Sequence, residues 1–223
     1  MFLSILIGED MENPFLPIVA DKDQKLIGKK LEDSKNLIKE IKNQKRLIII
    51  LGEYGSGKSL FVDAIKDTFS KQFKVTELVC YLDILDQLNK IAETKGKKSL
   101  IIIDKLELCI NNEIFKQLVE KIKELFSKGN YIILTSTPET KKDIEKAFGD
   151  INEKILYLVP NLDFEETKEL VINRLNSIQK NKAIRSLYPF TEKEIKEIWS
   201  KSKGNPRLIL MLCASLYESK HKE

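Results

Sequence analysis

The stretch Gly52-Glu53-Tyr54-Gly55-Ser56-Gly57-Lys58-Ser59 decides the fold expected of this 223-residue chain. It fits the pattern G-x-x-x-x-G-K-[ST] of a phosphate-binding P-loop. Leu47–Leu51, directly before it, is wholly apolar and is typical of a buried parallel strand. After it, apolar residues recur at helical spacing up to Phe69, so an amphipathic helix is expected to begin at Ser59. An accidental glycine-rich turn would not need this strand and helix on either side.

The residue types of this loop suit a bound phosphate chain. Glycines let the backbone curl with its amide N–H groups pointing inward, and the start of the following helix adds positive potential. Lys58 is expected to reach the β- and γ-phosphates, and Ser59 to bind Mg²⁺ through its hydroxyl. We therefore predict ATP or ADP with Mg²⁺ as the ligands. The residues of this segment expected to contact the nucleotide are Gly52, Glu53, Tyr54, Gly55, Ser56, Gly57, Lys58, Ser59 and Leu60.

Two later apolar segments end in polar side chains. Ser99–Asp104 follows the P-loop helix after one more predicted strand and a short helix. Asp104 therefore has the position of a Walker B aspartate, which would hold Mg²⁺, in many cases through water. Tyr131–Pro138 ends in hydroxyl residues that include Ser136, at the edge where parallel sheets form their sites.

Strands and helices alternate along most of the chain. Strands are expected at residues 47–51, 74–80, 99–104, 131–138 and 154–159, which predicts a doubly wound α/β P-loop NTPase core with a five-stranded parallel sheet. Only helical patterns follow Pro160, with capping boxes at two helix starts and Asn205 before a third. We therefore predict a nucleotide-binding core over residues 1–160 and a small all-α lid over residues 161–223, with Trp199 in the lid core.

The N-terminal residues 1–12 open with the apolar run MFLSILIG. This run is too short to span a membrane and has no basic residues before it. It is either an extra edge strand or docking segment, or a stretch upstream of a domain that begins at Met11. The helix that precedes the P-loop strand is expected to place Leu31, Ile38 and Ile41 largely on one face.

The composition narrows the class of protein. The chain is 42% hydrophobic and 32% charged, which is typical of a globular domain. Its net charge of +4 arises from 38 basic and 34 acidic residues and does not by itself indicate nucleic-acid binding. Cys80, Cys109 and Cys213 are scattered without a C-x-x-C pair, so a reduced, cytoplasmic protein is expected. The only histidine, His221, provides neither imidazole catalysis nor a metal cluster.

The order of motifs resembles that of AAA+ ATPases over nearly the whole chain, and of their initiator-like clade in particular. That clade includes archaeal origin-recognition proteins and ATPases of transposition and secretion. The G-N-P-R sequence at Gly204–Arg207 commonly opens a lid helix there, and Asn13-Pro14-Phe15 and Ile27-Gly28-Lys29 resemble its N-terminal segment. The resemblance implies that Ile27 packs near the adenine, although the family usually has Gly-Arg where this chain has Gly-Lys.

The resemblance also implies roles for single residues. Lys58 and Ser59 correspond to the Walker A pair and Asp104 to the Walker B aspartate. Ser136, or a neighbouring threonine, corresponds to sensor 1, which positions the attacking water. Arg207 corresponds to sensor 2, and a guanidinium on a mobile lid could report whether a γ-phosphate is present.

Two departures from the family pattern concern hydrolysis. The catalytic glutamate expected directly after Asp104 is replaced by Lys105, and Glu107 is the nearest acid. If the strand continued through Glu107, its side chain would lie on the opposite face from Lys105, whereas a turn would let it enter the site. The segment 138–154, which should supply an arginine finger, contains lysines and no arginine. A slow ATPase is therefore expected, since such a finger contributes about 10³-fold or more to the rate.

Three functions follow from these features. The first is a nucleotide-dependent switch with slow hydrolysis through Glu107, and the second is a scaffold that holds ATP without hydrolysis. The third, an oligomeric DNA-remodelling ATPase, is disfavoured by the lack of a trans arginine and of a recognisable winged helix. A protein partner is expected for the first two, whereas DNA binding and oligomerisation are implied by the clade alone.

Overall fold

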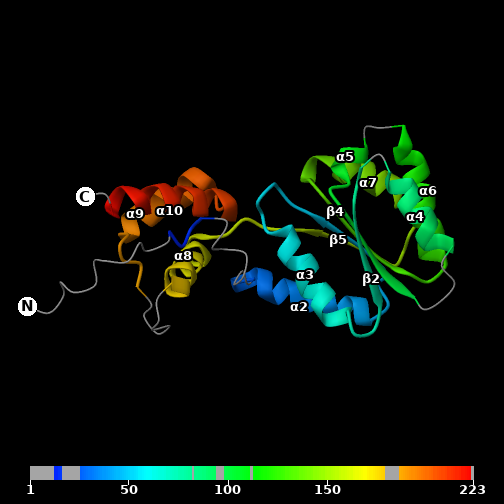
Figure 1. The fold of residues 1–223 in the computed structure, drawn as a ribbon, viewed down its shortest axis with the longest axis horizontal. Helices are drawn as coiled ribbons and strands as arrows, with labels where there is room; N and C mark the ends of the chain where they lie inside the picture. The colour runs from blue at the N-terminus through cyan, green and yellow to red at the C-terminus, as the bar shows by residue number, and fades with distance from the viewer. Residues whose placement is uncertain are drawn as a thin grey trace, which may run out of the picture. The chain divides into compact units, whose positions relative to one another are not determined.

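A computed structural model describes residues 13–16, 26–81, 83–93, 98–110, 113–178 and 186–221. The chain divides into two compact units (Figure 1). One is the α/β unit Gly28–Pro160, and the other, the helical unit, combines Asn161–Glu223 with the chain up to Ile27. The predictions for residues 1–12 lie outside the described residues.

A five-stranded parallel sheet forms the centre of the α/β unit, as predicted. Its strands are β1 (Leu47–Leu51), β2 (Lys74–Val79), β3 (Ser99–Asp104), β4 (Tyr131–Ser136) and β5 (Lys154–Leu158). Their spatial order is β2-β3-β4-β1-β5, so β1 lies between β4 and β5. Ile49 of β1 pairs with Leu134 of β4 and Leu156 of β5.

Helices cover both faces of this sheet, which explains why its central strands are apolar throughout (Figure 1). They are α2 (Gly28–Lys42), α3 (Lys58–Phe69), α4 (Ile84–Glu93), α5 (Glu107–Ile110), α6 (Ile114–Ser127), the 3₁₀ helix η1 (Pro138–Thr140) and α7 (Lys141–Ala147). Alternate residues of β1, including Leu47 and Ile49, pack with Leu88 of α4 and Ile122 of α6 in one buried cluster. The α2 and α3 helices lie on the other side of the sheet.

The buried face of α2 differs from the predicted one. Its buried residues are Lys30, Ser34, Leu37 and Ile41, whereas Leu31 is 41% exposed. Leu31 therefore lies outside the buried face, whereas Ile41 lies on it. The spacing i, i+4, i+7, i+11 is still helical, but its first members are polar because Lys30 reaches a carbonyl of the P-loop.

The helical unit contains α8 (Phe164–Ile178), α9 (Glu192–Ser202) and α10 (Pro206–His221). The predicted helix starts are confirmed. Glu166 N–H donates to Asp163 Oδ1 over 2.8 Å, Thr191 forms a complete capping box with Glu194, and Asn205 Oδ1 caps α10. Trp199 donates to Leu162 O over 3.0 Å and contacts Phe164, which is consistent with a packing role.

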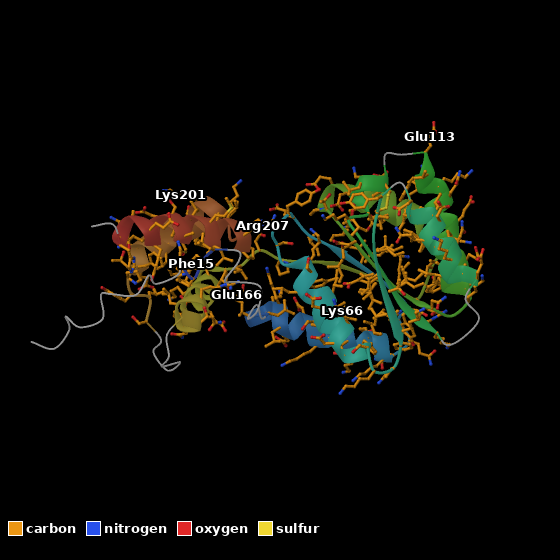
Figure 2. All side chains as sticks on the ribbon, in the orientation of Figure 1. Phe15, Lys66, Glu113, Glu166, Lys201 and Arg207 are labelled. Carbon is orange, nitrogen blue, oxygen red and sulfur yellow. A yellow bond between two sulfur atoms is a disulfide. The ribbon has the colours of Figure 1, made fainter. Side chains whose placement is uncertain are left out.

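The described N-terminal residues belong to the helical unit, whereas the sequence analysis assigned residues 1–160 to the core. Asn13 Nδ2 donates to Ala214 O of α10 over 3.1 Å. Phe15 is 2% exposed and packs against the rings of Phe190 and Tyr217 (Figure 2). These contacts join residues about two hundred positions apart, which no local pattern reports.

A disulfide joins Cys80, directly after β2, to Cys109 of α5. The prediction of three reduced cysteines is therefore wrong for this pair, since residues 29 positions apart are brought to a Cα–Cα distance of 6.1 Å. Cys213 is a free, buried thiol of α10, and burial raises its pKa to about 12.

Among the described residues, no helix is both long and apolar enough to span a membrane.

Candidate nucleotide-binding site

The carboxyl ends of three neighbouring strands, β1, β4 and β3, bring the predicted site residues to one edge of the sheet. The P-loop follows β1, Ser136 ends β4 and Asp104 ends β3. Backbone hydrogen bonds link these ends directly. Gly52 N–H donates to Ser136 O over 3.1 Å, and Leu106 N–H donates to Thr135 O over 2.9 Å.

The P-loop has the backbone shape that its glycines predict. Gly55 and Gly57 have φ angles of 81° and 97°, in the left-handed region that favours glycine. At Gly52, a Cβ atom would come within 2.5 Å of Ser56 Oγ, so a larger residue would displace the Ser56 hydroxyl. Lys58 opens α3 and its Nζ donates to Gly52 O over 2.6 Å and to Glu53 O over 3.1 Å.

A second lysine, Lys30, stabilises the P-loop from the buried face of α2. Lys30 of α2 is only 3% exposed, and its Nζ donates to Ser56 O over 2.8 Å. The sequence analysis missed this residue because lysines on an amphipathic helix are usually solvated. The sequence did contain one indication that Lys30 is buried: it lies at helical spacing from Ser34, Leu37 and Ile41, which share the buried face.

Asp104 is held by a hydroxyl of the neighbouring strand. Thr135 Oγ1 donates to Asp104 Oδ1 and accepts a hydrogen bond from Lys105 N–H over 3.2 Å. Thr135 is therefore the hydroxyl residue of β4 that contacts Asp104, the predicted Walker B aspartate, whereas Ser136 contacts Glu107. The hydrogen bond from Thr135 orients Asp104, and the Asp104 carboxylate remains an oxygen ligand suited to a hard cation.

The donor set fits Mg²⁺ rather than a metal held entirely by protein. The described residues contain no group of three or more His, Cys, Asp and Glu side chains that could hold a metal ion. Mg²⁺ usually binds through one or two protein oxygens and completes its shell with water and substrate phosphates. The Ser59 hydroxyl, at the start of α3 after the P-loop, and the Asp104 carboxylate, at the end of β3, provide oxygens of this kind at one edge of the sheet.

Glu107 enters the site through a turn. Lys105 has a φ of 58°, which ends the strand, and Glu107 is the first residue of the four-residue helix α5. Ser136 Oγ donates to Glu107 Oε2 over 3.2 Å, and Thr140 Oγ1 lies 2.8 Å from Ser136 Oγ. Glu107 Oε1 is buried and has no hydrogen-bond partner among the described residues. Of the two arrangements considered for residues 104–107, the structure has the turn.

Neighbouring charges shift the pKa values of two side chains around the loop. The negative charge of Glu107 is the main cause of the raised pKa of Tyr54, a residue of the P-loop. Lys58 Nζ lies 5.6 Å from the centre of the Tyr54 ring. The pKa of Glu139 in η1 is lowered by its own backbone N–H, by the Thr137 hydroxyl and, more weakly, by Lys58. Glu139 is thus a second carboxylate near the loop, and the sequence analysis missed it.

Two predicted residues belong to the helical unit. Arg207 is the second residue of α10, where its backbone N–H donates to Asn205 Oδ1 over 3.1 Å (Figure 2). Ile27 is 8% exposed and packs in the hydrophobic cluster of that unit. The roles of Arg207 as sensor 2 and of Ile27 at the adenine stay predictions.

No protein-family model matches this sequence, and no curated protein sequence matches it. Solved structures do share its fold. The Orc1 protein of Aeropyrum pernix in complex with DNA matches with a TM-score of 0.62 and 10% identity, over 94% of this chain and 64% of that chain.

Two further structures support the same comparison. The RuvB Holliday junction branch migration motor of Thermotoga maritima has a TM-score of 0.55 and 18% identity, over 86% of this chain and 63% of that chain. AMPPCP-bound DnaA of Aquifex aeolicus has a TM-score of 0.56 and 16% identity, over 82% of this chain and 60% of that chain. The chain thus spans less than two thirds of the length of each of these proteins.

These matches and the five-stranded parallel sheet show that the chain has the AAA+ ATPase fold. The predicted fold is therefore confirmed, and a DNA replication initiation factor is among its structural neighbours.

Proposed function

We propose that this protein binds ATP with Mg²⁺ at the P-loop and hydrolyses it slowly, as a nucleotide-dependent switch. The observation that carries the proposal is the hydrogen bond between Ser136 Oγ and Glu107 Oε2 at the edge that also holds the P-loop. It puts a carboxylate beside the phosphate-binding loop although the residue after Asp104 is a lysine.

Different residues of the site would serve nucleotide binding and nucleotide hydrolysis. Lys58 Nζ, which contacts two loop carbonyls, would turn to a phosphate oxygen as a stronger, charged acceptor. Mg²⁺, held by Ser59 and Asp104, would neutralise charge on the phosphates. Glu107 would accept a proton from the attacking water, while Ser136 orients its carboxylate through Oε2.

Slow hydrolysis rather than rapid cycling fits the local sequence. Lys105 stands where the family has its glutamate, the nearest acid, Glu107, lies two positions later, and the segment 138–154 contains no arginine. Bound ATP would therefore persist and fix the state of a partner-binding surface, which is the property of a switch. The cytoplasmic location, the protein partner and oligomerisation stay predictions.

The experiment is a single-turnover ATPase assay with Mg²⁺ on the wild type, Lys58→Ala and Glu107→Gln. We expect slow turnover in the wild type, ATP binding weakened about 10²-fold or more in Lys58→Ala, and unchanged binding with turnover reduced about 10³-fold in Glu107→Gln. Wild-type turnover that survives in Glu107→Gln would remove Glu107 from the mechanism. Stoichiometric ATP that stays intact through long incubation of the wild type would favour the second candidate, a non-hydrolysing scaffold, which the lysine at position 105 supports.

We also propose that the protein acts in a DNA-associated process. Its support is the similarity of fold to Orc1 in complex with DNA and to the RuvB branch migration motor. Binding of a duplex should weaken steeply as salt rises if phosphate contacts carry it. The test is duplex binding by fluorescence anisotropy, with and without ATP, at several salt concentrations. Absence of binding at low salt would exclude DNA as the partner.

A further inference from the structure

The Cys80–Cys109 disulfide restrains the segment Asp104–Cys109, which carries Glu107, at both of its ends. Cys80 N–H donates to Asp104 O over 2.9 Å, so one half of the cystine is joined to the start of this segment. Cys109, the other half, is two residues after Glu107 in α5. Both cysteines are 1% exposed, so the bond is part of the packed core beneath the site.

The short helix α5 depends on contacts with neighbouring elements. It is a helix of four residues, and an isolated helix of that length is unstable because nucleation costs more than its few hydrogen bonds return. Another anchor of the segment is Leu106, which is fully buried and whose N–H donates to Thr135 O over 2.9 Å. The disulfide is therefore the covalent restraint that is closest in sequence to Glu107.

We propose that the Cys80–Cys109 disulfide is a positioning element that holds α5 so that Glu107 faces Ser136, and that reducing it slows hydrolysis without weakening nucleotide binding. The inference rests on the proposed function, in which Glu107 accepts the proton of the attacking water. Binding is spared because the loop is held by Lys30, Lys58 and the Gly52–Ser136 backbone bond, none of which involves α5.

The expected effect follows from how steeply catalysis depends on position. A displacement of about 1 Å at a catalytic group can cost about 10²-fold in rate. Because Leu106 still anchors one side of the segment, we expect a smaller loss, about tenfold, when the disulfide opens.

The chemistry of the test is thiol–disulfide exchange. Dithiothreitol reduces the cystine to two thiols and becomes a cyclic disulfide, so two electrons and two protons pass to the protein. Oxidised glutathione reverses the change, since one such disulfide is reduced to two glutathione molecules as the protein bond forms again. A thiol count in denaturant should give one thiol, that of Cys213, in the oxidised protein and three in the reduced protein.

The experiment compares single-turnover hydrolysis and nucleotide affinity in the oxidised, reduced and reoxidised full chain. We expect hydrolysis to fall about tenfold on reduction and to recover on reoxidation, with an unchanged dissociation constant for ATP. The double variant Cys80→Ala, Cys109→Ala should match the reduced protein, and Cys213→Ala should respond to dithiothreitol as the wild type does. In a Glu107→Gln background, reduction should change nothing further.

Each contrary result overturns the inference in a recognisable way. Equal rates before and after a verified reduction overturn it, and the proposed function survives if Glu107→Gln still abolishes turnover. Three thiols in protein treated with oxidised glutathione overturn it, because no bond then exists to position Glu107. Parallel loss of binding and hydrolysis overturns it in favour of a general role in folding. Absence of turnover in every state overturns both proposals.

Discussion

The P-loop and the segment from Asp104 to Cys109 lie at the same edge of one sheet, but the chain builds them in different ways. The P-loop is a continuous stretch whose glycine angles and helix start follow from its own residues. The second segment departs from the family pattern and depends on other elements: Thr135 orients Asp104, Ser136 contacts Glu107 and Cys80 holds Cys109.

This difference separates binding from turnover. A phosphate cradle made of backbone N–H groups tolerates variation elsewhere, since its donors come from the loop itself. A catalytic carboxylate must be delivered by the elements around it, and here a left-handed residue and a four-residue helix deliver it. Substitutions in the two regions should therefore affect different measurements.

The largest expected effect is on turnover. Glu107→Gln should reduce single-turnover hydrolysis about 10³-fold, because an amide cannot accept the proton of the attacking water. The affinity for ATP should stay within about twofold of the wild type, since the loop contacts are unchanged. Glu113→Gln, an exposed carboxylate before α6, is the control and should hydrolyse ATP at the wild-type rate. A similar loss of hydrolysis in Glu113→Gln would mean that the net charge of the protein, and not the position of Glu107, determines the rate.

Lys58→Ala should affect the P-loop and therefore the affinity for ATP. Removing a charged partner of a phosphate costs about 2–5 kcal/mol, so the affinity for ATP should fall about 10²-fold or more. Isothermal titration calorimetry measures this directly. Lys71→Ala, an exposed lysine beyond the end of the same helix, should bind as the wild type does. Unchanged affinity in Lys58→Ala would contradict the assignment of the P-loop as the phosphate site.

Lys30→Met tests the buried support of the loop. The loss of a charged hydrogen bond to Ser56 O should weaken ATP binding about tenfold. Thermal stability without nucleotide should also fall somewhat, because the buried Ser56 carbonyl loses its Lys30 donor. Lys35→Met, exposed on the same helix, is the matched control. A lower melting temperature with unchanged affinity would assign Lys30 to folding alone.

Thr135→Val has the smallest expected effect and concerns the border between the two regions. Asp104 would lose its hydroxyl donor while the strand keeps its shape. We expect the Mg²⁺ concentration needed for half-maximal ATP binding to rise about threefold to tenfold. Thr76→Val, on edge strand β2, should leave this concentration unchanged. Equal shifts in both variants would show that the effect comes from the substitution type and not from Asp104.

Most of the fold could be predicted because each element carries its own periodic signal. The five strands, the capping boxes and the Asn205 cap are local in sequence, and the structure has them within one or two residues of the predicted bounds. The errors concern contacts between distant segments. Leu31 was assigned to a face that Lys30 occupies, residues 13–16 pack on α10, and Cys80 pairs with Cys109.

The sequence by itself determined the phosphate-binding loop, because the spacing of Gly52, Gly57 and Lys58 specifies a backbone shape and a charge within one continuous stretch. It also showed that the usual acid after Asp104 is replaced. Only the tertiary structure decided where Glu107 lies, since a single left-handed residue at Lys105 and contacts from β4 and β2 set its direction. Such contacts join residues far apart in the chain, and their energies depend on packing that no local pattern contains.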